Sequence, residues 1–320
     1  MNKIFFFCLL FVFDLEGRFI RKIGKIGQGS GEYLEIRDFT MDTVNCILFL
    51  CDAGNRVHKF KFDGTYINTI TIQSPDSHSL YIHYYNERLY ANYIERDRVQ
   101  QELLLLEIDP SDGKVLSRLL PKEYNKGWNE LVSIENSHFF ISRANNPPRI
   151  SLMFADYIFS IEEEITPYIE LKSKNMVTDK NIENLPNGQS LFESLMQLFQ
   201  GSSKIWDVHS FAENDDFIIF RHQTGFFQYN SVVFNKKTKA VRLANYLAND
   251  LLFMHDRDGF WGDFKFSDNK GAYGVLPAVS LGKFQEYIKS YNVQPSLDKL
   301  NQLKKLNEEP NPVIFYYEFK

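Results

Sequence analysis

The stretch Phe60-Lys-Phe-Asp-Gly-Thr-Tyr-Ile-Asn-Thr-Ile70 holds two segments in which apolar and polar residues alternate, joined by Asp-Gly. Alternation with a period of two is typical of β-strands that bury one face. An Asp-Gly pair between two such segments favours a tight turn. The stretch therefore predicts a β-hairpin.

The same pattern returns along the chain, so the hairpin is a repeating unit. Gly17 and Gly64 are 47 residues apart and Gly64 and Gly113 are 49 apart, and two further strand-like runs lie between consecutive copies. Four strands in about 40–50 residues make one blade of a β-propeller. A long β-sandwich is the alternative, but sandwiches do not repeat a hairpin at fixed spacing. The copies span 11–23, 60–70, 105–116, 157–171 and 232–243, and the two intervening runs are 35–41 and 47–51.

The composition of the 320-residue chain also favours sheets, because 29 Phe, 17 Tyr and 3 Trp stand against 10 Ala. Aromatic side chains suit the half-buried surface of a sheet, whereas Ala is the best helix former. We expect most repeated rings to fill the space between blades rather than to contact a ligand. The rings concerned are Phe11, Phe13, Phe19, Phe60, Phe62, Tyr66, Tyr157 and Phe159.

Two stretches break the strand pattern and predict short helical insertions near 188–200 and 284–307. The first has a helical stripe from Leu191 to Phe199, and the second ends at Pro310. The segment Val313–Phe319 then predicts a closing strand, and we expect strands from both ends of the chain to complete one blade.

A family resemblance rests on three motifs. Ile23-Gly-Lys-Ile-Gly-Gln-Gly-Ser-Gly-Glu-Tyr33, followed by Ile36-Arg-Asp-Phe39, resembles the signature of bacterial six-bladed β-propellers related to the NHL-repeat group. Leu50-Cys-Asp-Ala-Gly-Asn-Arg56 is similar to the Asp-x-x-Asn-x-Arg turn of NHL repeats, and Glu309–Ile314 is similar to the family's closing strand. The resemblance implies an all-β, six-bladed, NHL-like propeller. It also implies export to the periplasm or cell envelope, often as lipoproteins, without a settled biochemical function.

The beginning of the chain has two interpretations. Residues 1–13 carry one lysine and then ten apolar residues, as in the front of a signal peptide, but Leu10–Phe13 also fits a core strand. We expect a signal-like start that merges into a strand, followed by one propeller domain over 11–320, with the completeness of the first blade left open. Cys8 lacks the small neighbours of a lipobox. Cys46 and Cys51 lie an odd number of residues apart in one strand-like run, which predicts buried thiols that do not pair.

Charge excludes one class of partner. The formal net charge is −5, and the only short basic run, Lys236–Lys239, fits a turn between strands. A nucleic-acid-binding surface is normally basic, so we expect no nucleic acid as partner. The ten-residue apolar run is too short to cross a bilayer, so no transmembrane segment is expected.

Known chemical motifs are incomplete in this chain. The Gly-rich run 24–32 leads into another strand, whereas a dinucleotide-binding loop opens a helix, so it predicts a connection between blades. The Asp256–Gly259 segment has Ser267 at the twelfth position, where a calcium loop needs Glu. The seven histidines form no metal-ligand spacing. We therefore predict no catalytic residues, no metal and no cofactor.

The remaining candidates belong to a binding site. Propellers bind ligands near the innermost strands, and polar or aromatic residues on or near such strands could line a pocket for a glycan or an anion. The sequence predicts a monomeric binding protein for an unknown glycan, peptide or envelope protein. The alternative is a lactonase or lyase that uses a divalent cation at the channel mouth. The candidate binding residues are Arg37, Asp38, Arg143, Trp206, Arg221, His222 and His255.

Overall fold

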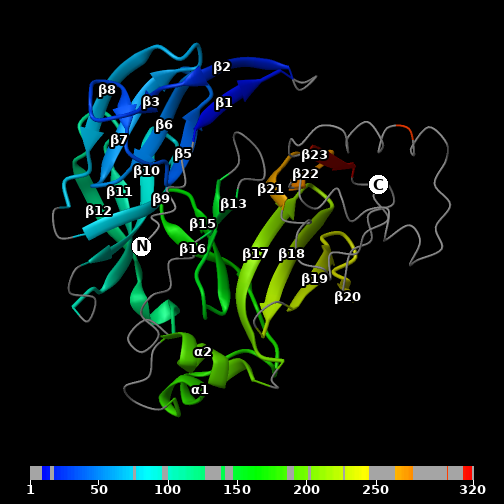
Figure 1. Cartoon of the computed structure of the whole chain (residues 1–320). Coiled ribbons are helices and arrows are strands. Elements are labelled where there is room, and N and C mark those ends of the chain that lie inside the picture. Colours follow the sequence, from blue (N-terminus) through cyan, green and yellow to red (C-terminus); the bar gives the residue numbers. More distant parts are fainter. Residues whose placement is uncertain are drawn as a thin grey trace. The chain divides into compact units, whose positions relative to one another are not determined.

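The structure, a computed structural model, describes residues 9–14, 18–74, 77–95, 100–126, 138–140, 147–185, 191–200, 203–225, 228–244, 264–276, 301 and 313–318. Antiparallel sheets dominate this part of the chain, and helices are few and short (Figure 1). The chain forms two compact units, Met1–Tyr124 and Asn125–Lys320. Each unit is described by itself.

The first unit contains a four-stranded antiparallel sheet at the position of the second repeat. Its strands follow the chain in order, and the predicted hairpin 60–70 forms its last two strands. The runs 35–41 and 47–51 form its first two. The strands are β5 (Asp38–Asp42), β6 (Ile47–Asp52), β7 (Arg56–Lys61) and β8 (Tyr66–Thr71).

A second four-stranded sheet in this unit follows the same order, and the predicted hairpin 105–116 again supplies its last two strands. The first strands of the two sheets pack against each other, and a core cluster that includes Phe49, Ile72 and Leu106 is buried between the sheets. The strands are β9 (Ser77–Tyr85), β10 (Arg88–Glu95), β11 (Leu103–Ile108) and β12 (Val115–Pro121), and a 3-10 turn, Lys122–Tyr124, follows.

The first predicted hairpin forms a separate two-stranded sheet, β1 (Leu10–Phe13) with β2 (Phe19–Ile23). Its inner face carries Leu10 and Val12, which pack on the cluster of Tyr33, Leu48, Leu50 and Phe60. The prediction that Phe11, Phe13 and Phe19 fill the core is therefore wrong: all three are exposed and contact one another. Both faces of β1 are apolar, so alternation alone could not tell which face points inward. Phe62 is also partly exposed, whereas Phe60 and Phe159 are buried as predicted.

The Gly-rich run leads into a strand rather than a helix, as predicted, but it connects the two-stranded β1–β2 sheet, and not a complete blade, to the first four-stranded sheet. Its strands β3 (Lys25–Ile26) and β4 (Glu32–Tyr33) pair in parallel, and Gly24 and Gly31 have φ values of 63° and 71°. The buried Tyr33 ring lies against Gly24, where a Cβ atom would come within 2.7 Å of it. Glycine is thus required at this position both by the backbone conformation and by the close approach.

The cysteine prediction is half confirmed. Cys51 is a buried free thiol in β6, whereas Cys46 is exposed and free. Cys46 lies in the turn before β6 with φ at 55°, so it does not belong to the strand. Cys8 lies outside the described residues.

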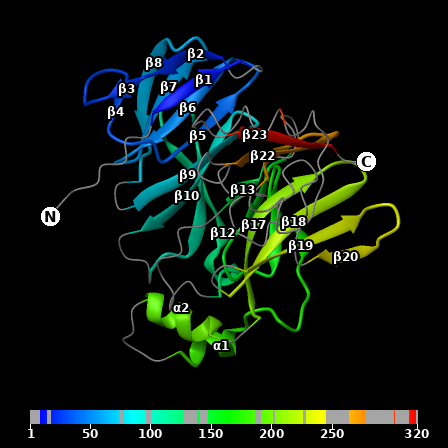
Figure 2. The same ribbon diagram turned by 45° about the vertical axis from the view of Figure 1, so that its right-hand side comes forward.

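The second unit contains two four-stranded sheets and one three-stranded sheet (Figure 2). The predicted hairpins 157–171 and 232–243 again form the last two strands of their sheets. One sheet holds β13 (His138–Phe140), β14 (Arg149–Ser151), β15 (Tyr157–Ile161) and β16 (Ile165–Glu170). The next holds β17 (Ile205–Glu213), β18 (Phe217–Thr224), β19 (Gln228–Asn235) and β20 (Val241–Ala244).

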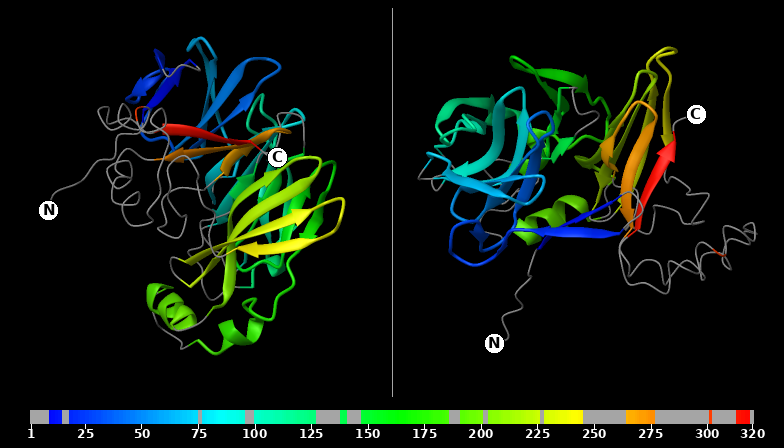
Figure 3. Two further views of the ribbon diagram at one scale, coloured as in Figure 1. Left: turned by 90° about the vertical axis from the view of Figure 1, so that its right-hand side faces the viewer. Right: turned by 90° about the horizontal axis from the view of Figure 1, so that it is seen from above.

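The three-stranded sheet consists of β21 (Phe264–Ser267), β22 (Gly271–Leu276) and β23 (Val313–Glu318), seen in orange and red in Figure 3. β23 confirms the predicted closing strand. Within the described residues the sheet contains no strand from the beginning of the chain, so the expected joining of both ends in one blade is not observed. β21 packs against β17, and β17 packs against β13, which places the first strands of these sheets next to one another.

Two short helices lie between β16 and β17. In α1 (Asp179–Glu183) the Thr178 side chain caps the N-terminus together with Asn181. The predicted helix near 188–200 is confirmed as α2 (Leu191–Phe199), whose Leu198 and Phe199 are buried. The predicted helix near 284–307 lies outside the described residues, apart from Asn301.

These sheets make an all-β propeller with five blades among the described residues, which corrects the predicted six. The blades begin at β5, β9, β13, β17 and β21. The first copy of the hairpin repeat contributes only the two-stranded β1–β2 sheet. The interval between β16 and β17 holds α1 and α2 instead of strands. The spacing of the first turns therefore does not hold along the whole chain.

Candidate functional site

The second unit contains a cleft of about 1270 Å³ between the outer strand β16 and the face of the β18–β19–β20 sheet. Blades diverge outward from their inner strands, so two neighbouring blades are farthest apart at their outer strands. The gap is lined by apolar side chains in its middle and by polar or charged side chains at its two ends. The apolar lining residues are Ile169, Leu171, Met176, Ile205, Ile218, Phe220, Val232, Phe234, Val241 and Leu243.

Strand register explains how the sheet wall is built. Alternate residues of β18 face the cleft, and their partners on β19 face the same way because opposite residues in an antiparallel pair share a face. The register pairs Ile218 with Phe234, Phe220 with Val232, His222 with Asn230, and Thr224 with Gln228. The wall therefore changes from apolar to polar along the strands. On β20, Leu243 lies beside Val232, and Val241 lies beside Phe234.

The end of the cleft near Phe234 is called the charged end. Lys236 and Lys239 line it, and Lys239 lies over the Phe234 ring at 5.9 Å. The Lys236 ammonium is 2.5 Å from Oε1 of Glu213, a carboxylate that is 4% exposed. Arg149 also reaches this carboxylate, at 3.3 Å. Two cations thus share one buried carboxylate.

Tyr168 closes the charged end from the β16 side. Its hydroxyl donates to Glu213, and its ring stacks on the Arg149 guanidinium at 3.7 Å. Burial and the hydrogen bond to the Glu213 carboxylate raise the pKa of Tyr168 to about 12. The hydroxyl therefore stays protonated and keeps its role as a donor at neutral pH.

The opposite end of the cleft, called the polar end, carries neutral hydrogen-bonding groups. Asn230 donates to the Thr224 hydroxyl at 3.2 Å, and Gln228 and Asn175 also line this end. Burial lowers the pKa of His222 to about 4, so its imidazole is neutral at physiological pH. A second cavity of about 520 Å³ shares Glu170, Lys172 and neighbouring residues with the cleft.

Five of the sequence-predicted binding residues belong to this unit, three of these five are among the described residues, and one of the three lines the cleft. His222 on β18 does so. Trp206 on β17 is buried between Phe154 and Phe199, with ring separations of 5.9 and 5.0 Å, and its indole N–H donates to the Gly225 carbonyl. That placement favours a packing role for Trp206.

Arg221 precedes His222 on β18 and is 2% exposed. Its guanidinium lies over the Tyr229 ring at 4.8 Å. Because neighbouring residues of a strand point to opposite faces, Arg221 and His222 do not share a face of the sheet. The structure therefore does not bring them together in one pocket.

Arg37 and Asp38 belong to the first unit. Asp38 is the first residue of β5, and β5 is the first strand of its sheet. Arg37 pairs with Glu35 at 2.6 Å, and Asp38 accepts the Ile82 N–H at 2.9 Å. Burial raises the pKa of Asp38 to about 6, although the backbone N–H donors oppose this shift. The two remaining candidates, Arg143 and His255, lie outside the described residues.

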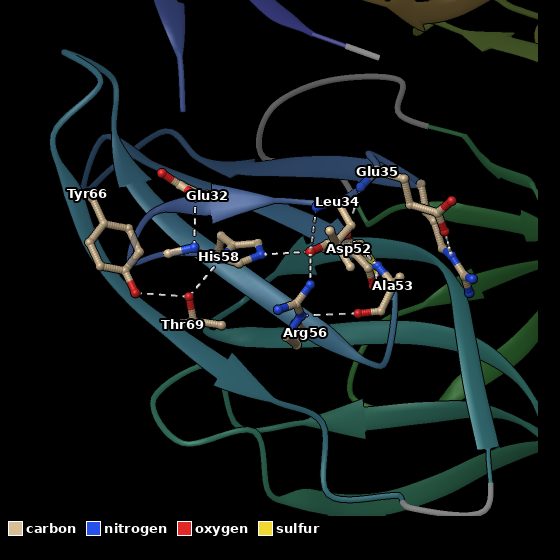
Figure 4. A network of polar contacts seen from close by, with 12 residues as sticks. Glu32, Leu34, Glu35, Asp52, Ala53, Arg56, His58, Tyr66 and Thr69 are labelled. Atoms are coloured by element: carbon tan, nitrogen blue, oxygen red, sulfur yellow. Dashed lines mark hydrogen bonds and ion pairs between the residues drawn. The ribbon is translucent and has the colours of Figure 1, made fainter. Parts of the chain in front are cut away.

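The turn Asp52–Arg56 also carries a polar network in the first unit (Figure 4). Asp52, which is fully buried, accepts N–H groups of Leu34, Glu35 and Ala53 at 2.7–3.2 Å. It also accepts from Arg56 at 2.5 Å and contacts His58 at 3.1 Å. The network ties the segment before β5 to the turn between β6 and β7.

The contacts from Asp52 to His58 and from His58 to the Thr69 hydroxyl resemble the acid, histidine and hydroxyl of a catalytic triad, but His58 and Asp52 are buried. His58 also contacts the Thr69 hydroxyl at 2.7 Å, and Tyr66 contacts the same hydroxyl at 2.9 Å. His58 is 2% exposed, and the Asp52 oxygens are already occupied by five partners. These groups therefore hold the blade together rather than contact a substrate.

Two further features of the described residues bear on function. No group of three or more His, Cys, Asp and Glu side chains in this part of the chain is arranged to hold a metal ion. None of its helices is both long and apolar enough to cross a membrane.

Sequence reasoning missed the residues that line the charged end and the outer wall. Lys236 and Lys239 fitted a turn between strands, and Val241 and Leu243 belong to the last predicted hairpin, 232–243. The sequence does contain a signal for this surface. Val241 and Leu243 alternate on the last strand of a hairpin, and among the described residues no further strand of the same sheet follows it. That pattern predicts an apolar surface left open at the outer edge of a blade.

Comparison with known structures supports the fold. A protein from Bacteroides fragilis NCTC 9343, named "Putative exported protein", has 16% sequence identity and a TM-score of 0.72, with 98% of this chain and 85% of that chain covered. BamB from Moraxella catarrhalis has 10% identity and a TM-score of 0.39, covering 71% and 56%. The Myceliophteria thermophila Cps50 (Swd1) β-propeller domain has 9% identity and a TM-score of 0.37, covering 83% and 86%. The last two likenesses are too weak to carry an argument.

No curated protein matches the sequence. A family model described as "Domain of unknown function (DUF4934)" matches residues 2–318, which is nearly the whole chain. The chain therefore belongs to the DUF4934 family.

Proposed function

We propose that this protein is a ligand-binding β-propeller of the bacterial cell envelope, and that its ligand lies in the cleft between β16 and the β18–β20 sheet. The observation that carries the proposal is a cleft of about 1270 Å³ with an exposed apolar wall. Large concave sites with an apolar lining and a few polar groups are the usual binding sites of proteins. Val241 and Leu243 are 60% and 74% exposed, so their apolar surface is available to a ligand.

Two observations support the proposed location in the cell envelope. The apolar start of the sequence is similar to the front of a signal peptide. The Bacteroides fragilis protein that shares the fold bears the name "Putative exported protein". The proposed relation to NHL propellers is supported by the Asp52–Arg56 turn, which closes β6 onto β7 as its sequence motif predicts. Fractionation of the source bacterium, with an antibody against this protein, tests the location: the protein should appear in the envelope fractions, and a purely cytoplasmic signal would contradict it.

Binding in the cleft can be tested with N-phenyl-1-naphthylamine, a neutral apolar fluorophore. Leu243→Asp places a charge on the apolar wall, so the affinity for the probe should fall about tenfold, as the loss of one buried leucine contact implies. Glycans, peptides and lipids that displace the probe then identify ligand candidates.

Leu116→Asp is the matched control, because Leu116 is also an exposed leucine (42%) on the last strand of a blade, but in the first unit. This variant should bind the probe as the unaltered protein does. Equal loss in both variants, or no loss in Leu243→Asp, would show that the cleft is not the binding site.

A further inference from the structure

The backbone of the cleft walls determines which ligands can lie in its middle. β18 pairs with β17 and β19, and β19 pairs with β18 and β20, so the backbone groups of these two strands are used within the sheet. The facing wall, β16, pairs with β15. Among the described residues β16 is the last strand of its sheet, so only one of its edges is paired. On the β18–β19 side, a ligand therefore meets side chains of a sheet face rather than a row of backbone donors and acceptors.

This arrangement favours an alkyl chain over a peptide or a sugar. A peptide laid on the apolar β18–β20 face would bury N–H and C=O groups without partners, which costs free energy for each group. The hydroxyls of a glycan would meet the same surface. An alkyl chain has no polar groups along its length, so it loses nothing on contact with Val232, Val241 and Leu243.

The charged end determines the head group. The lining residues of the whole cleft include three lysines and one glutamate, and two of these lysines, Lys236 and Lys239, lie at the charged end. Lys172 is paired with that glutamate, Glu170, at 2.8 Å, and Lys236 is paired with Glu213. Lys239 is exposed, and among the described residues no carboxylate lies within 4 Å of its ammonium. An anionic group at this end would therefore complete the charge balance.

We propose that the cleft binds a free single-chain amphiphile of the fatty-acid class. The alkyl chain lies along the apolar wall formed by Phe234, Val241 and Leu243, and the carboxylate lies at Lys239. This inference rests on the proposed function, because it names the ligand class of the same cleft. The inference also explains why the turn between β19 and β20 contains lysines, since a turn at this place can form without basic residues.

Isothermal titration calorimetry on the whole protein, with octanoate, decanoate and dodecanoate below their micellar concentrations, tests the chain. Each added pair of methylenes should raise the affinity about tenfold while the apolar wall is being covered. Dodecyltrimethylammonium has the same chain and the opposite charge, and it should bind more weakly than dodecanoate.

The head-group position is tested with Lys239→Asn. Asn tolerates the left-handed backbone of this residue, whose φ is 60°, so the variant removes the charge without adding strain. Its affinity for dodecanoate should fall about two- to fivefold, as expected for an exposed charge pair, and its preference for the anion over the cation should disappear. Lys237→Asn is the control: Lys237 lies in the same turn but pairs with Asp216 at 2.6 Å and does not line the cleft, so this variant should keep the preference.

Three outcomes would overturn the inference. Equal affinities for the three chain lengths would exclude the alkyl contact, and equal affinities for the anion and the cation would exclude the head-group site. If an acidic apolar peptide or a glycan displaces the neutral probe in a Leu243-dependent manner while dodecanoate does not, the ligand class is wrong and the proposed function stands. If neither the neutral probe nor any of these ligands binds in a Leu243-dependent manner, both proposals fail.

Discussion

Asp52 shows how one side chain can hold a blade. Burial alone would raise the pKa of its carboxyl, but the hydrogen bonds from Glu35, His58, Leu34 and Ala53 outweigh burial and hold the pKa below its ordinary value. A carboxylate with a lowered pKa stabilises the folded state above the pKa of the unfolded chain. The contribution is lost as the pH falls through the folded pKa.

Replacement of Asp52 by Asn should therefore destabilise the first unit strongly. The variant leaves Arg56 and His58 facing an amide, and the loss of one partner from a buried ionic network costs about 3 kcal/mol of unfolding free energy. Urea denaturation followed by circular dichroism measures the change at pH 7. The difference from the unaltered protein should shrink below the ordinary pH range of carboxyl titration and disappear as the pH falls through the lowered pKa of Asp52, where its carboxylate becomes protonated.

Asp63→Asn is the control for this variant, since Asp63 caps an exposed turn through the Thr65 N–H. It should change the unfolding free energy much less than Asp52→Asn. Equal effects at the two positions would mean that the network around Asp52 does not hold the blade.

The sequence predicted the turn from Asp52 to Arg56 but not the role of its residues. Asp and Asn are typical turn formers, so their presence was explained by local conformation alone. Their actual partners lie far away along the chain: Asp52 binds Leu34 and Glu35, and Asn55 accepts the Ser79 N–H and donates to the Ser74 carbonyl. Such contacts follow from the packing of segments, which a local pattern does not contain.

At the scale of elements, the repeated hairpins are the most predictable part of this protein. All five form where alternation and turn residues predict them, and four of them are the outer halves of blades. The face that each strand buries was less predictable. Residues 10–13 are apolar at every position, so the inward face was assigned to Phe11 and Phe13, although Leu10 and Val12 pack on the core.

Two turn glycines separate two effects of adding a side chain at a turn: strain of the backbone and a steric clash with a neighbouring segment. Gly54 and Gly113 both have positive φ, at 71° and 83°. A Cβ atom at Gly54 meets nothing within 4 Å, whereas at Gly113 it would lie 2.2 Å from the Thr71 carbonyl oxygen. Gly54→Ala should cost about 1 kcal/mol of unfolding free energy through backbone strain, and Gly113→Ala about 3 kcal/mol because the clash is added.

Thermal or urea denaturation of the two alanine variants measures this difference. The prediction is contradicted if Gly54→Ala is as destabilising as Gly113→Ala, since the close approach to Thr71 would then contribute nothing.

At the scale of the whole molecule, the chain is an all-β propeller whose described blades belong to two compact units. The first unit has the cores around Phe49 and Tyr33, and the second has the cores around Phe211 and Trp206. The propeller class was predictable from the repeat, whereas the blade number was not. The insertion of α1 and α2 and the two-stranded first hairpin break the period on which a count depends.

Because the two units have separate cores, we expect a destabilising substitution in one unit to speed amide hydrogen exchange in that unit alone. In hydrogen exchange read out by mass spectrometry, Asp52→Asn should speed exchange in β5–β12 and leave β13–β22 unchanged. Glu213→Gln, which weakens the buried contacts to Arg149 and Lys236, should do the reverse. A uniform loss of protection in either variant would show that the two units open together.

The placement of thiols and indoles along the chain makes such measurements possible without added labels. All three cysteines precede Tyr124 and all three tryptophans follow it. Burial raises the pKa of the Cys51 thiol to about 12, so in the folded state this thiol is both shielded and un-ionised, whereas Cys46 is open to solvent. Pulsed alkylation followed by peptide mapping should then modify Cys46 at once and Cys51 only when the first unit opens. Indole emission, including that of the buried Trp206, reports the second unit in the same tube.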